Sequence, residues 1–155
     1  MTDDKAVLVD TNVLLSATAP LRPLHHAALA VLNDWPNQGT VLTTSIQVLR
    51  EYLAVATRPV EVNGLGLGTD DALTNVMAFR SRMRLLVDSE IAWDRLRTLI
   101  ANYGCAGKQV HDANIVATAL SFGITKLVTA NVRDFSRFAA DIEVTDLAEI
   151  DSMRS

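Results

Sequence analysis

Several features that mark particular protein classes are missing from this sequence. It contains a single cysteine, Cys105, which excludes an internal disulfide, and no group of cysteines and histidines has the spacing of a zinc site. No apolar run is long enough to cross a bilayer, and Asp3 and Asp4 stand where a signal peptide has basic and apolar residues. We therefore expect a cytoplasmic protein without a membrane segment, a disulfide framework or a zinc site.

An excess of positive charge is also missing. The chain has 14 lysines and arginines against 18 aspartates and glutamates, which gives a formal net charge of −4. The total charge therefore provides no general attraction to nucleic acids. A polyanionic ligand would have to be bound by a local group of basic residues or through a metal ion.

The glycine motifs of nucleotide-binding proteins are absent as well. The first apolar run, 6–9, is not followed by GxGxxG, which disfavours a dinucleotide-dependent oxidoreductase. The glycine-rich segment 61–69 lacks the GK[ST] ending of a P-loop. An acid after the first strand also suits a phosphotransferase that forms an aspartyl phosphate. The sequence argues against this interpretation, because Asn12 stands where the DxD motif of haloacid dehalogenase-like enzymes has its second aspartate.

What the chain does contain is an alternation of short apolar runs and longer amphipathic stretches. The apolar runs predict strands at 6–9, 40–44, 85–87, 126–129 and 142–144. The amphipathic stretches predict helices at 11–17, 22–35, 46–58, 70–84, 90–103 and 111–122, and the segment 104–109 is expected to be a loop. Pro23 is placed near the first turn of its helix, and Ser45 is expected to cap the helix that follows it.

This alternation predicts a fold class. Strands that are almost wholly apolar and alternate with helices indicate a parallel sheet covered on both faces. The chain has 155 residues and neither repeats nor a linker segment, so one domain is expected over 1–155. We predict a three-layer α/β/α domain with a central, mainly parallel sheet.

Polar side chains stand at positions typical of a site in such a fold, because ligands bind beyond the carboxyl ends of parallel strands. Taken singly, each has an ordinary explanation as a helix-terminal, solvated or turn residue. Taken together, several carboxylates in one partly buried pocket would repel one another unless a cation neutralised them. Oxygen ligands without thiolate or clustered imidazole suit Mg²⁺ or Mn²⁺. The residues concerned are Asp10, Glu51, Asp112, Asn131 and Asp134.

Four motifs carry a resemblance to a known family. The segments VLVDTNVLL, SIQVLREY, HDANIVATAL and KLVTANVRDF have the order and approximate spacing found in PIN-domain nucleases, and nearly the whole chain resembles a VapC-type toxin of a bacterial toxin–antitoxin pair. By this resemblance, Asp10, Glu51 and Asp112 correspond to the three principal acidic residues of the family. Many members have an aspartate where this chain has Asn131 and a further acid where it has Asp134, so either residue could complete the site.

The resemblance implies an activity. It implies hydrolysis of single-stranded or looped RNA with Mg²⁺, for which Mn²⁺ would substitute, leaving a 5′-phosphate and a 3′-hydroxyl. Asp10 and Asp112 are expected to be direct metal ligands. Glu51 is expected either to orient the attacking water from outside the ligand set or to bind a second metal ion. Asp134 is a further catalytic candidate.

Substrate contacts are expected from residues within and beside these motifs. Thr11, Asn12, Ser45 and Asn131 are candidates to hold waters or the scissile phosphate, although helix capping accounts equally well for Thr11 or Ser45. Basic residues flank the motifs and could contact the phosphate backbone, or could simply be solvated surface charges. They are Arg50, Lys108, Arg133 and Arg137, of which Arg133 is the preferred substrate-binding residue.

The resemblance also implies partners. A cognate antitoxin would cover the acidic site with a basic segment, and many relatives form homodimers. The alternative to an enzyme is a catalytically degenerate PIN-like module that binds RNA or protein without cleaving it. Asn131, which brings no charge to the fourth motif, is the feature that favours this alternative.

Overall fold

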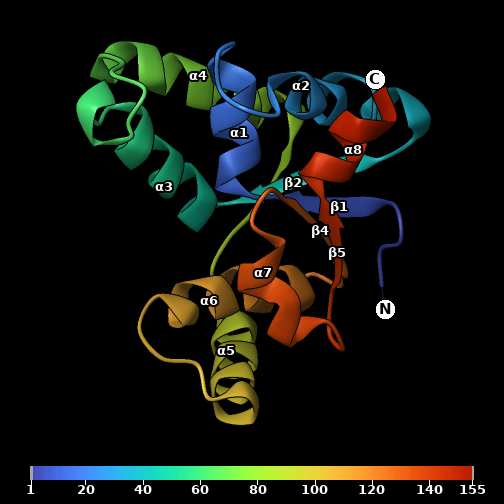
Figure 1. Ribbon diagram of the computed structural model, residues 1–155. Helices are drawn as coiled ribbons and strands as arrows, with labels where there is room; N and C mark the ends of the chain where they lie inside the picture. Colours follow the sequence, from blue (N-terminus) through green and yellow to red (C-terminus); the bar gives the residue numbers. More distant parts are fainter. Residues whose placement is uncertain (1, 155) are drawn as a thin grey trace.

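The sheet is the centre of the molecule, and all five of its strands are parallel. The computed structural model describes residues 2–154, and the side chains of residues 2–150. The strands lie in the order β3-β2-β1-β4-β5 (Figure 1). Their bounds are β1 Ala6–Val9, β2 Val41–Ser45, β3 Arg84–Leu86, β4 Lys126–Thr129 and β5 Glu143–Asp146. The predicted parallel sheet is confirmed, and each predicted strand is found with its ends displaced by at most two residues.

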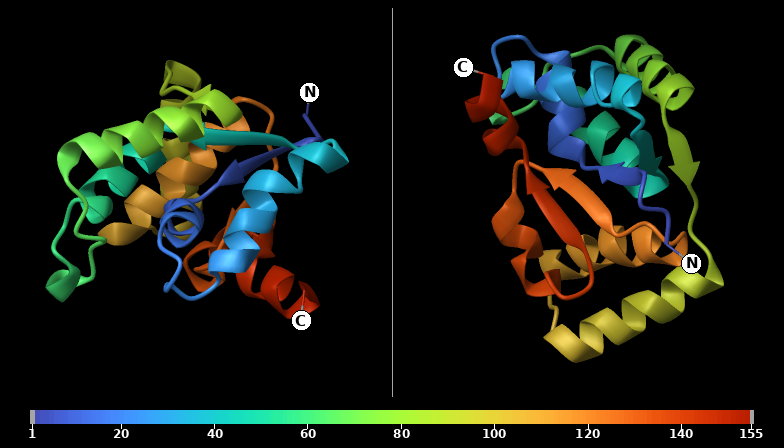
Figure 2. Two further views of the ribbon diagram at one scale, coloured as in Figure 1. Left: turned by 90° about the horizontal axis from the view of Figure 1, so that it is seen from above. Right: turned by 90° about the vertical axis from the view of Figure 1, so that its right-hand side faces the viewer.

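Helices cover both faces of this sheet, which confirms the predicted three-layer α/β/α architecture (Figures 1 and 2). One layer contains α1 Thr11–Thr18, α2 His25–Asn33, α3 Ile46–Ala56, α4 Thr69–Arg82 and α8 Leu147–Arg154. The opposite layer contains α5 Glu90–Tyr103, α6 Lys108–Ser121 and α7 Val132–Phe135. Three single turns complete the chain: η1 Pro36–Gln38, η2 Val60–Val62 and η3 Ser136–Phe138.

The apolar strands form the core between the two helical layers. Every residue of β1 is at most 4% exposed, because this strand is central in the sheet and is covered on both sides. Leu127 and Val128 of β4 are fully buried beside it. Within the described part of the chain, no helix is both long and apolar enough to span a membrane.

Two predicted helix starts were wrong, and in both places the backbone adopts a positive φ that a helix cannot continue through. The helix predicted from residue 22 begins at His25, because Leu24 has φ 66°, so Pro23 precedes the helix instead of lying in its first turn. The helix predicted from residue 111 begins at Lys108, directly after Gly107 with φ 60°. Asp112 therefore lies in the second turn of α6 and not at its start.

The remaining differences concern short segments. The helix predicted to reach Arg84 ends at Arg82, because Arg84 pairs with Thr43 as the first residue of β3. The helix predicted over 46–58 ends at Ala56. Neither α7, with four residues, nor α8, with eight, was predicted.

Candidate active site

A cavity of about 260 Å³ opens at the carboxyl ends of β1 and β4, and its lining residues come from helices of both layers. It is lined by four carboxylates, Asp10, Glu51, Asp112 and Asp134, and by two cations, Arg22 and Lys108. The polar residues Thr11, Asn12 and Asn131 and the apolar residues Leu15, Val55, Ile115 and Phe135 complete the lining. The fold thus brings together all four acidic residues selected from the sequence.

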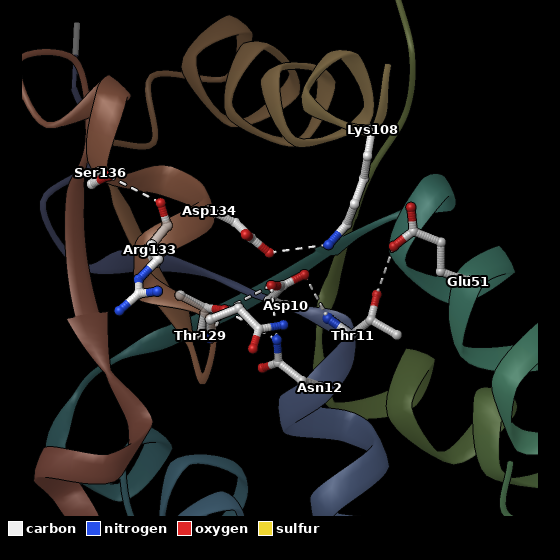
Figure 3. Close-up of polar contacts among 10 residues, drawn as sticks. Asp10, Thr11, Asn12, Glu51, Lys108, Thr129, Arg133, Asp134 and Ser136 are labelled. Atoms are coloured by element: carbon white, nitrogen blue, oxygen red, sulfur yellow. Dashed lines mark hydrogen bonds and ion pairs between the residues drawn. The ribbon is translucent and has the colours of Figure 1, made fainter. Parts of the chain in front are cut away.

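Asp10 lies at the floor of this cavity and is held by three hydrogen bonds (Figure 3). It is the N-cap residue of α1, and its Oδ1 accepts from the backbone N–H of Thr11 at 2.8 Å. Its Oδ2 accepts from Thr129 Oγ1 at 2.8 Å and from Asn12 Nδ2 at 3.1 Å. Burial raises the pKa of Asp10 and the nearby Glu51 carboxylate adds to this rise, whereas these hydrogen bonds oppose it.

Thr129 connects several of these groups, and sequence reasoning did not select it as a site residue. Its fully buried hydroxyl donates to Asp10 and accepts from Asn12 Nδ2 at 3.1 Å and from the backbone N–H of Asn131 at 3.0 Å. The amide oxygen of Asn12 accepts from the backbone N–H of Ala130 at 2.9 Å. Thr129 is the last residue of β4, the strand that neighbours β1 in the parallel sheet, and this position is the signal that would have identified it.

Glu51 projects from α3 toward the same cavity and has a hydrogen-bond donor on each oxygen. Thr11 Oγ1 donates to Glu51 Oε2 at 3.1 Å, and Gln47 Nε2 donates to Glu51 Oε1 at 2.9 Å. Because the Thr11 backbone also binds Asp10, this threonine ties two carboxylates together (Figure 3). The same network contains Gln47 and Asn114, which sequence reasoning also missed.

Asp112 and Asp134 differ from Asp10 in how their carboxylates are engaged. Asp134 Oδ2 forms an ion pair with Lys108 Nζ at 3.2 Å, and this pair raises the pKa of the lysine. The half-buried carboxylate of Asp112 makes no hydrogen bond or ion pair to any other described residue. Burial, followed by repulsion from Asp134, raises its pKa to about 6, and the charge of Lys108 limits this rise.

Two residues predicted to bind substrate lie elsewhere. Ser45 is 1% exposed, accepts from the backbone N–H of Val48 as the cap of α3, and does not line the cavity. Arg133 is exposed and lies outside the lining, with its guanidinium directed away from Asp10 in Figure 3. The structure supports neither as a substrate ligand. The cations that do line the cavity are Lys108, which flanks a motif, and Arg22, which was not selected from the sequence.

Thr11, Asn12 and Asn131 do line the cavity, but the first two are already engaged. The Thr11 hydroxyl and the Asn12 amide are held by carboxylates and by backbone or hydroxyl groups of the protein. Asn131 is exposed at the rim and its backbone N–H is bound to Thr129. Thr11 and Asn12 therefore position carboxylates, and the side chain of Asn131 is the one nearer to solvent.

The donor set fits a hydrated hard cation. Its oxygens come from carboxylates and amides, and neither cysteine nor histidine lines the cavity. Among the described residues, no three acidic, histidine or cysteine side chains converge closely enough to enclose an ion by themselves. Mg²⁺ does not require such a cage, because it keeps several waters and binds through one or two carboxylates. Asp10 and Asp112, the expected direct ligands, both line the cavity, as do Glu51 and Asp134.

Comparison with known proteins gives three results. The sequence model of the PIN domain matches residues 7–141, a range that contains all of the cavity lining. Ribonuclease VapC24 of Mycobacterium tuberculosis (strain CDC 1551 / Oshkosh) is 26% identical over 135 residues, which cover 84% of this chain and 89% of that protein. Chains in solved structures of toxin–antitoxin proteins share the fold of this chain.

A chain of the DNA-bound VapBC structure from Salmonella typhimurium superposes with a TM-score of 0.65 at 22% identity, covering 95% of this chain and 99% of that chain. A chain of a toxin–antitoxin complex from Klebsiella pneumoniae superposes with a TM-score of 0.63 at 21% identity, covering 91% of this chain and 97% of that chain. Each of these likenesses therefore extends over more than nine-tenths of this chain.

Proposed function

The chain belongs to the PIN-domain family, and on that premise we propose that it is a metal-dependent endoribonuclease, the toxin component of a toxin–antitoxin pair. The observation that carries this proposal is a single cavity lined by four carboxylates and two cations. Carboxylates suit a divalent cation, and cations suit the phosphates of RNA. The relative VapC24 is named a ribonuclease, which supports the same activity.

Asp10 and Asp112 would hold a Mg²⁺ or Mn²⁺ ion at the floor of the cavity. A bound ion of this kind supplies an acidified water for attack on phosphorus and a positive charge that offsets the charge developing on the phosphate. The Asp10 carboxylate is oriented by Thr11, Asn12 and Thr129, so it needs little rearrangement to serve as a ligand. The carboxylate of Asp112, which has no partner among the described residues, is free to turn toward the ion.

The other lining residues have roles that follow from their contacts. Glu51, fixed by Thr11 and Gln47, would accept a hydrogen bond from the water that the ion binds, so it contributes to metal affinity as well as to the orientation of the attacking water. Asp134 holds the Lys108 ammonium at the rim of the cavity, where the lysine faces an entering phosphate. Arg22 lines the cavity without an ion pair in the described chain, so its guanidinium is available to a phosphate oxygen.

The proposed reaction consumes one water for each bond cut. The water oxygen bonds to phosphorus, the bond from phosphorus to the 3′ oxygen breaks, and that oxygen takes up a proton. The products are a 5′-phosphate and a 3′-hydroxyl. We propose single-stranded or looped RNA as the substrate, because a flexible strand can bend its backbone into a cavity that is lined by helices of both layers.

Incubation with RNA tests this function directly. Purified protein, freed of any partner, is incubated with end-labelled cellular RNA in Mg²⁺, in Mn²⁺ and in EDTA. We expect discrete cleavage products in either metal and intact RNA in EDTA. RNA that is bound but remains intact in metal would instead favour the degenerate PIN-like module, with Asn131 as the position at which activity was lost. The cavity argues against that alternative, because Asp134 keeps a fourth carboxylate beside Asn131.

Removal of either cavity cation is expected to weaken substrate binding. Arg22→Ala and Lys108→Ala should each raise KM for RNA about tenfold, the loss that corresponds to one hydrogen bond to a charged group. Arg133→Ala is the matched control, since Arg133 is an exposed cation outside the cavity, and its KM should equal that of the wild type. An effect of Arg133→Ala as large as the other two would place the RNA path on the outer surface of α7.

We also propose an antitoxin as the cognate partner. The fold is that of chains solved in toxin–antitoxin structures, and an acidic cavity is complementary to a basic segment of such a partner. A homodimer, which would bring two such cavities onto one RNA, and a cytoplasmic location complete the proposal. Copurification with the product of a neighbouring gene tests the antitoxin. Light scattering that detects only a monomer at all concentrations would contradict the homodimer.

A further inference from the structure

We propose that Gln47 is a positioning residue that sets the placement of Glu51 relative to Asp112 by bridging the two helical layers beside the cavity. The inference rests on the proposed function, because it concerns the carboxylates assigned to metal and water. It adds to the site a residue that does not line the cavity.

Gln47 lies in the first turn of α3 and is only 4% exposed. Its Nε2 donates both to Glu51 Oε1, at 2.9 Å, and to the backbone carbonyl of His111, at 3.0 Å. Its Oε1 accepts from Asn114 Nδ2 at 2.7 Å. The two hydrogens and the oxygen of the amide are all engaged, so this side chain has a single orientation.

These bonds reach from one layer of the fold to the other. Helix α3 lies on one side of the sheet and α6 on the opposite side (Figure 1). In the described chain, every hydrogen bond between these two helices involves Gln47. Its partners on α6, His111 and Asn114, stand on either side of Asp112 in the sequence. Gln47 thus fixes the helical turn that carries Asp112.

On the other side, Gln47 fixes Glu51. One oxygen of Glu51 is held by Gln47 and the other by Thr11, whose backbone N–H binds Asp10. A continuous path of hydrogen bonds therefore runs from Asp10 through Thr11 and Glu51 to Gln47 and α6. Within this path Gln47 is the link that crosses from α3 to α6, so the spacing between Glu51 and Asp112 depends on it.

Partners of this kind affect metal sites by orienting the ligands, and their loss typically costs 10–100-fold in metal affinity or activity. A buried amide that served only the stability of the helix packing would leave the metal affinity of the folded protein unchanged. In either case, removal of Gln47 leaves the Asn114 amide and the His111 carbonyl without this hydrogen-bond partner, so a lower melting temperature does not separate the two roles. A change in metal affinity does separate them.

The test measures Mn²⁺ affinity by calorimetry, below the melting temperature of each variant. Gln47→Leu, similar in size but without hydrogen bonds, is expected to weaken Mn²⁺ binding about tenfold. In a Glu51→Gln background the same substitution should weaken binding less than about twofold, because its effect is transmitted through Glu51. Asn75→Leu is the matched control: Asn75 on α4 donates to Tyr52 of α3 at 3.1 Å, away from the cavity, and its loss should leave Mn²⁺ affinity unchanged.

Wild-type affinity in folded Gln47→Leu, or an equal loss in both backgrounds, would overturn the inference. Should Gln47→Leu not fold, Asn114→Ala removes the 2.7 Å bond on the α6 side and leaves the bond to Glu51 in place. A loss of Mn²⁺ affinity in that variant supports the role, and wild-type affinity overturns it.

RNA cleavage measured on the same proteins separates this inference from the proposed function. A wild type that binds Mn²⁺ but cuts no RNA contradicts the nuclease, whereas weaker binding by Gln47→Leu still supports the positioning role. A wild type that cuts RNA, alongside a Gln47→Leu variant with unchanged affinity and rate, contradicts the positioning role alone. Absence of Mn²⁺ binding by the wild type overturns both.

Discussion

Asp10→Asn is expected to lower the rate of RNA cleavage by at least about 100-fold. Loss of a residue that only orients a metal ligand costs up to about 100-fold, and loss of the ligand itself should cost no less. Asparagine nearly preserves the shape of the side chain and can still accept from the backbone N–H of Thr11. It removes the negative charge, and its amide nitrogen cannot accept from Thr129 or Asn12 as Asp10 Oδ2 does. Both the binding of the cation and the network around it are therefore impaired.

Single-turnover cleavage of a labelled RNA in saturating Mg²⁺ measures this effect. Asp94→Asn serves as the control, because Asp94 is an exposed aspartate of α5 whose ion pair with Arg97 lies outside the cavity. Its rate should match that of the wild type. If Asp10→Asn cut RNA as fast as Asp94→Asn, the cleaving site would lie elsewhere on the molecule.

Asp112→Asn is expected to lower the rate of RNA cleavage about as much as Asp10→Asn does. In the absence of metal, the same substitution is expected to make the folded protein more stable at pH 8. The folded-state pKa of Asp112 is about 6, above its ordinary value of 3.8. Between these two pH values the folded protein binds more protons than the unfolded chain. The stability associated with Asp112 therefore falls as pH rises through this window, and it stays lost above pH 6. Asparagine carries no charge and avoids this loss.

Thermal unfolding in EDTA at pH 4 and at pH 8 tests the sign of this effect. The variant should exceed the wild type in melting temperature at pH 8, with little difference at pH 4. Addition of Mn²⁺ should raise the melting temperature of the wild type much more than that of the variant, because only the folded wild type retains both carboxylates for the ion. A variant less stable than the wild type at pH 8 would show that favourable contacts hold the Asp112 carboxylate, and would contradict a pKa raised by burial and repulsion.

The sequence predicts the parts of this site that depend on local pattern. Asp10 directly follows a fully apolar strand, and the rule that ligands bind at the carboxyl ends of parallel strands places it in the site. Glu51 and Asp112 were selected because each lies beside apolar helix residues that had to face the core. All three line the cavity in the structure. For these residues, the position after a strand and the apolar pattern of the helices point to a shared pocket, and the resemblance to PIN-domain nucleases identifies them as its principal acids.

The residues that escaped prediction depend on contacts between segments far apart in the chain. Gln47 meets Asn114 across 67 positions, and Thr129 meets Asp10 across 119. Neither a buried glutamine nor a threonine at a strand end has a local pattern that marks it. Arg22 reaches the cavity from the segment before α2, where Leu24 turns the chain with a positive φ that the apolar pattern did not reveal. Ser45 shows the converse, because a local capping role accounts for it completely.

The acidity of the fourth motif depends on both kinds of information. From the sequence alone, Asn131 suggested that the site had lost a carboxylate. In the structure, Asp134 lines the cavity beside Asn131, one helical turn further along the chain, although its charge is shared with Lys108. The site therefore has four carboxylates, with Asp134 balanced by a cation of its own.

The chemistry of the cut RNA ends tests the central claim most directly, that the carboxylate cavity activates water with a divalent cation. RNA cleaved in Mg²⁺ is treated with a 5′-phosphate-dependent exonuclease and with a ligase that requires a 3′-hydroxyl. We predict fragments that are substrates for both enzymes and are absent when EDTA replaces Mg²⁺. Fragments that end in a 2′,3′-cyclic phosphate and form equally in EDTA would show attack by the RNA's own 2′-hydroxyl, and would contradict metal-dependent hydrolysis in this cavity.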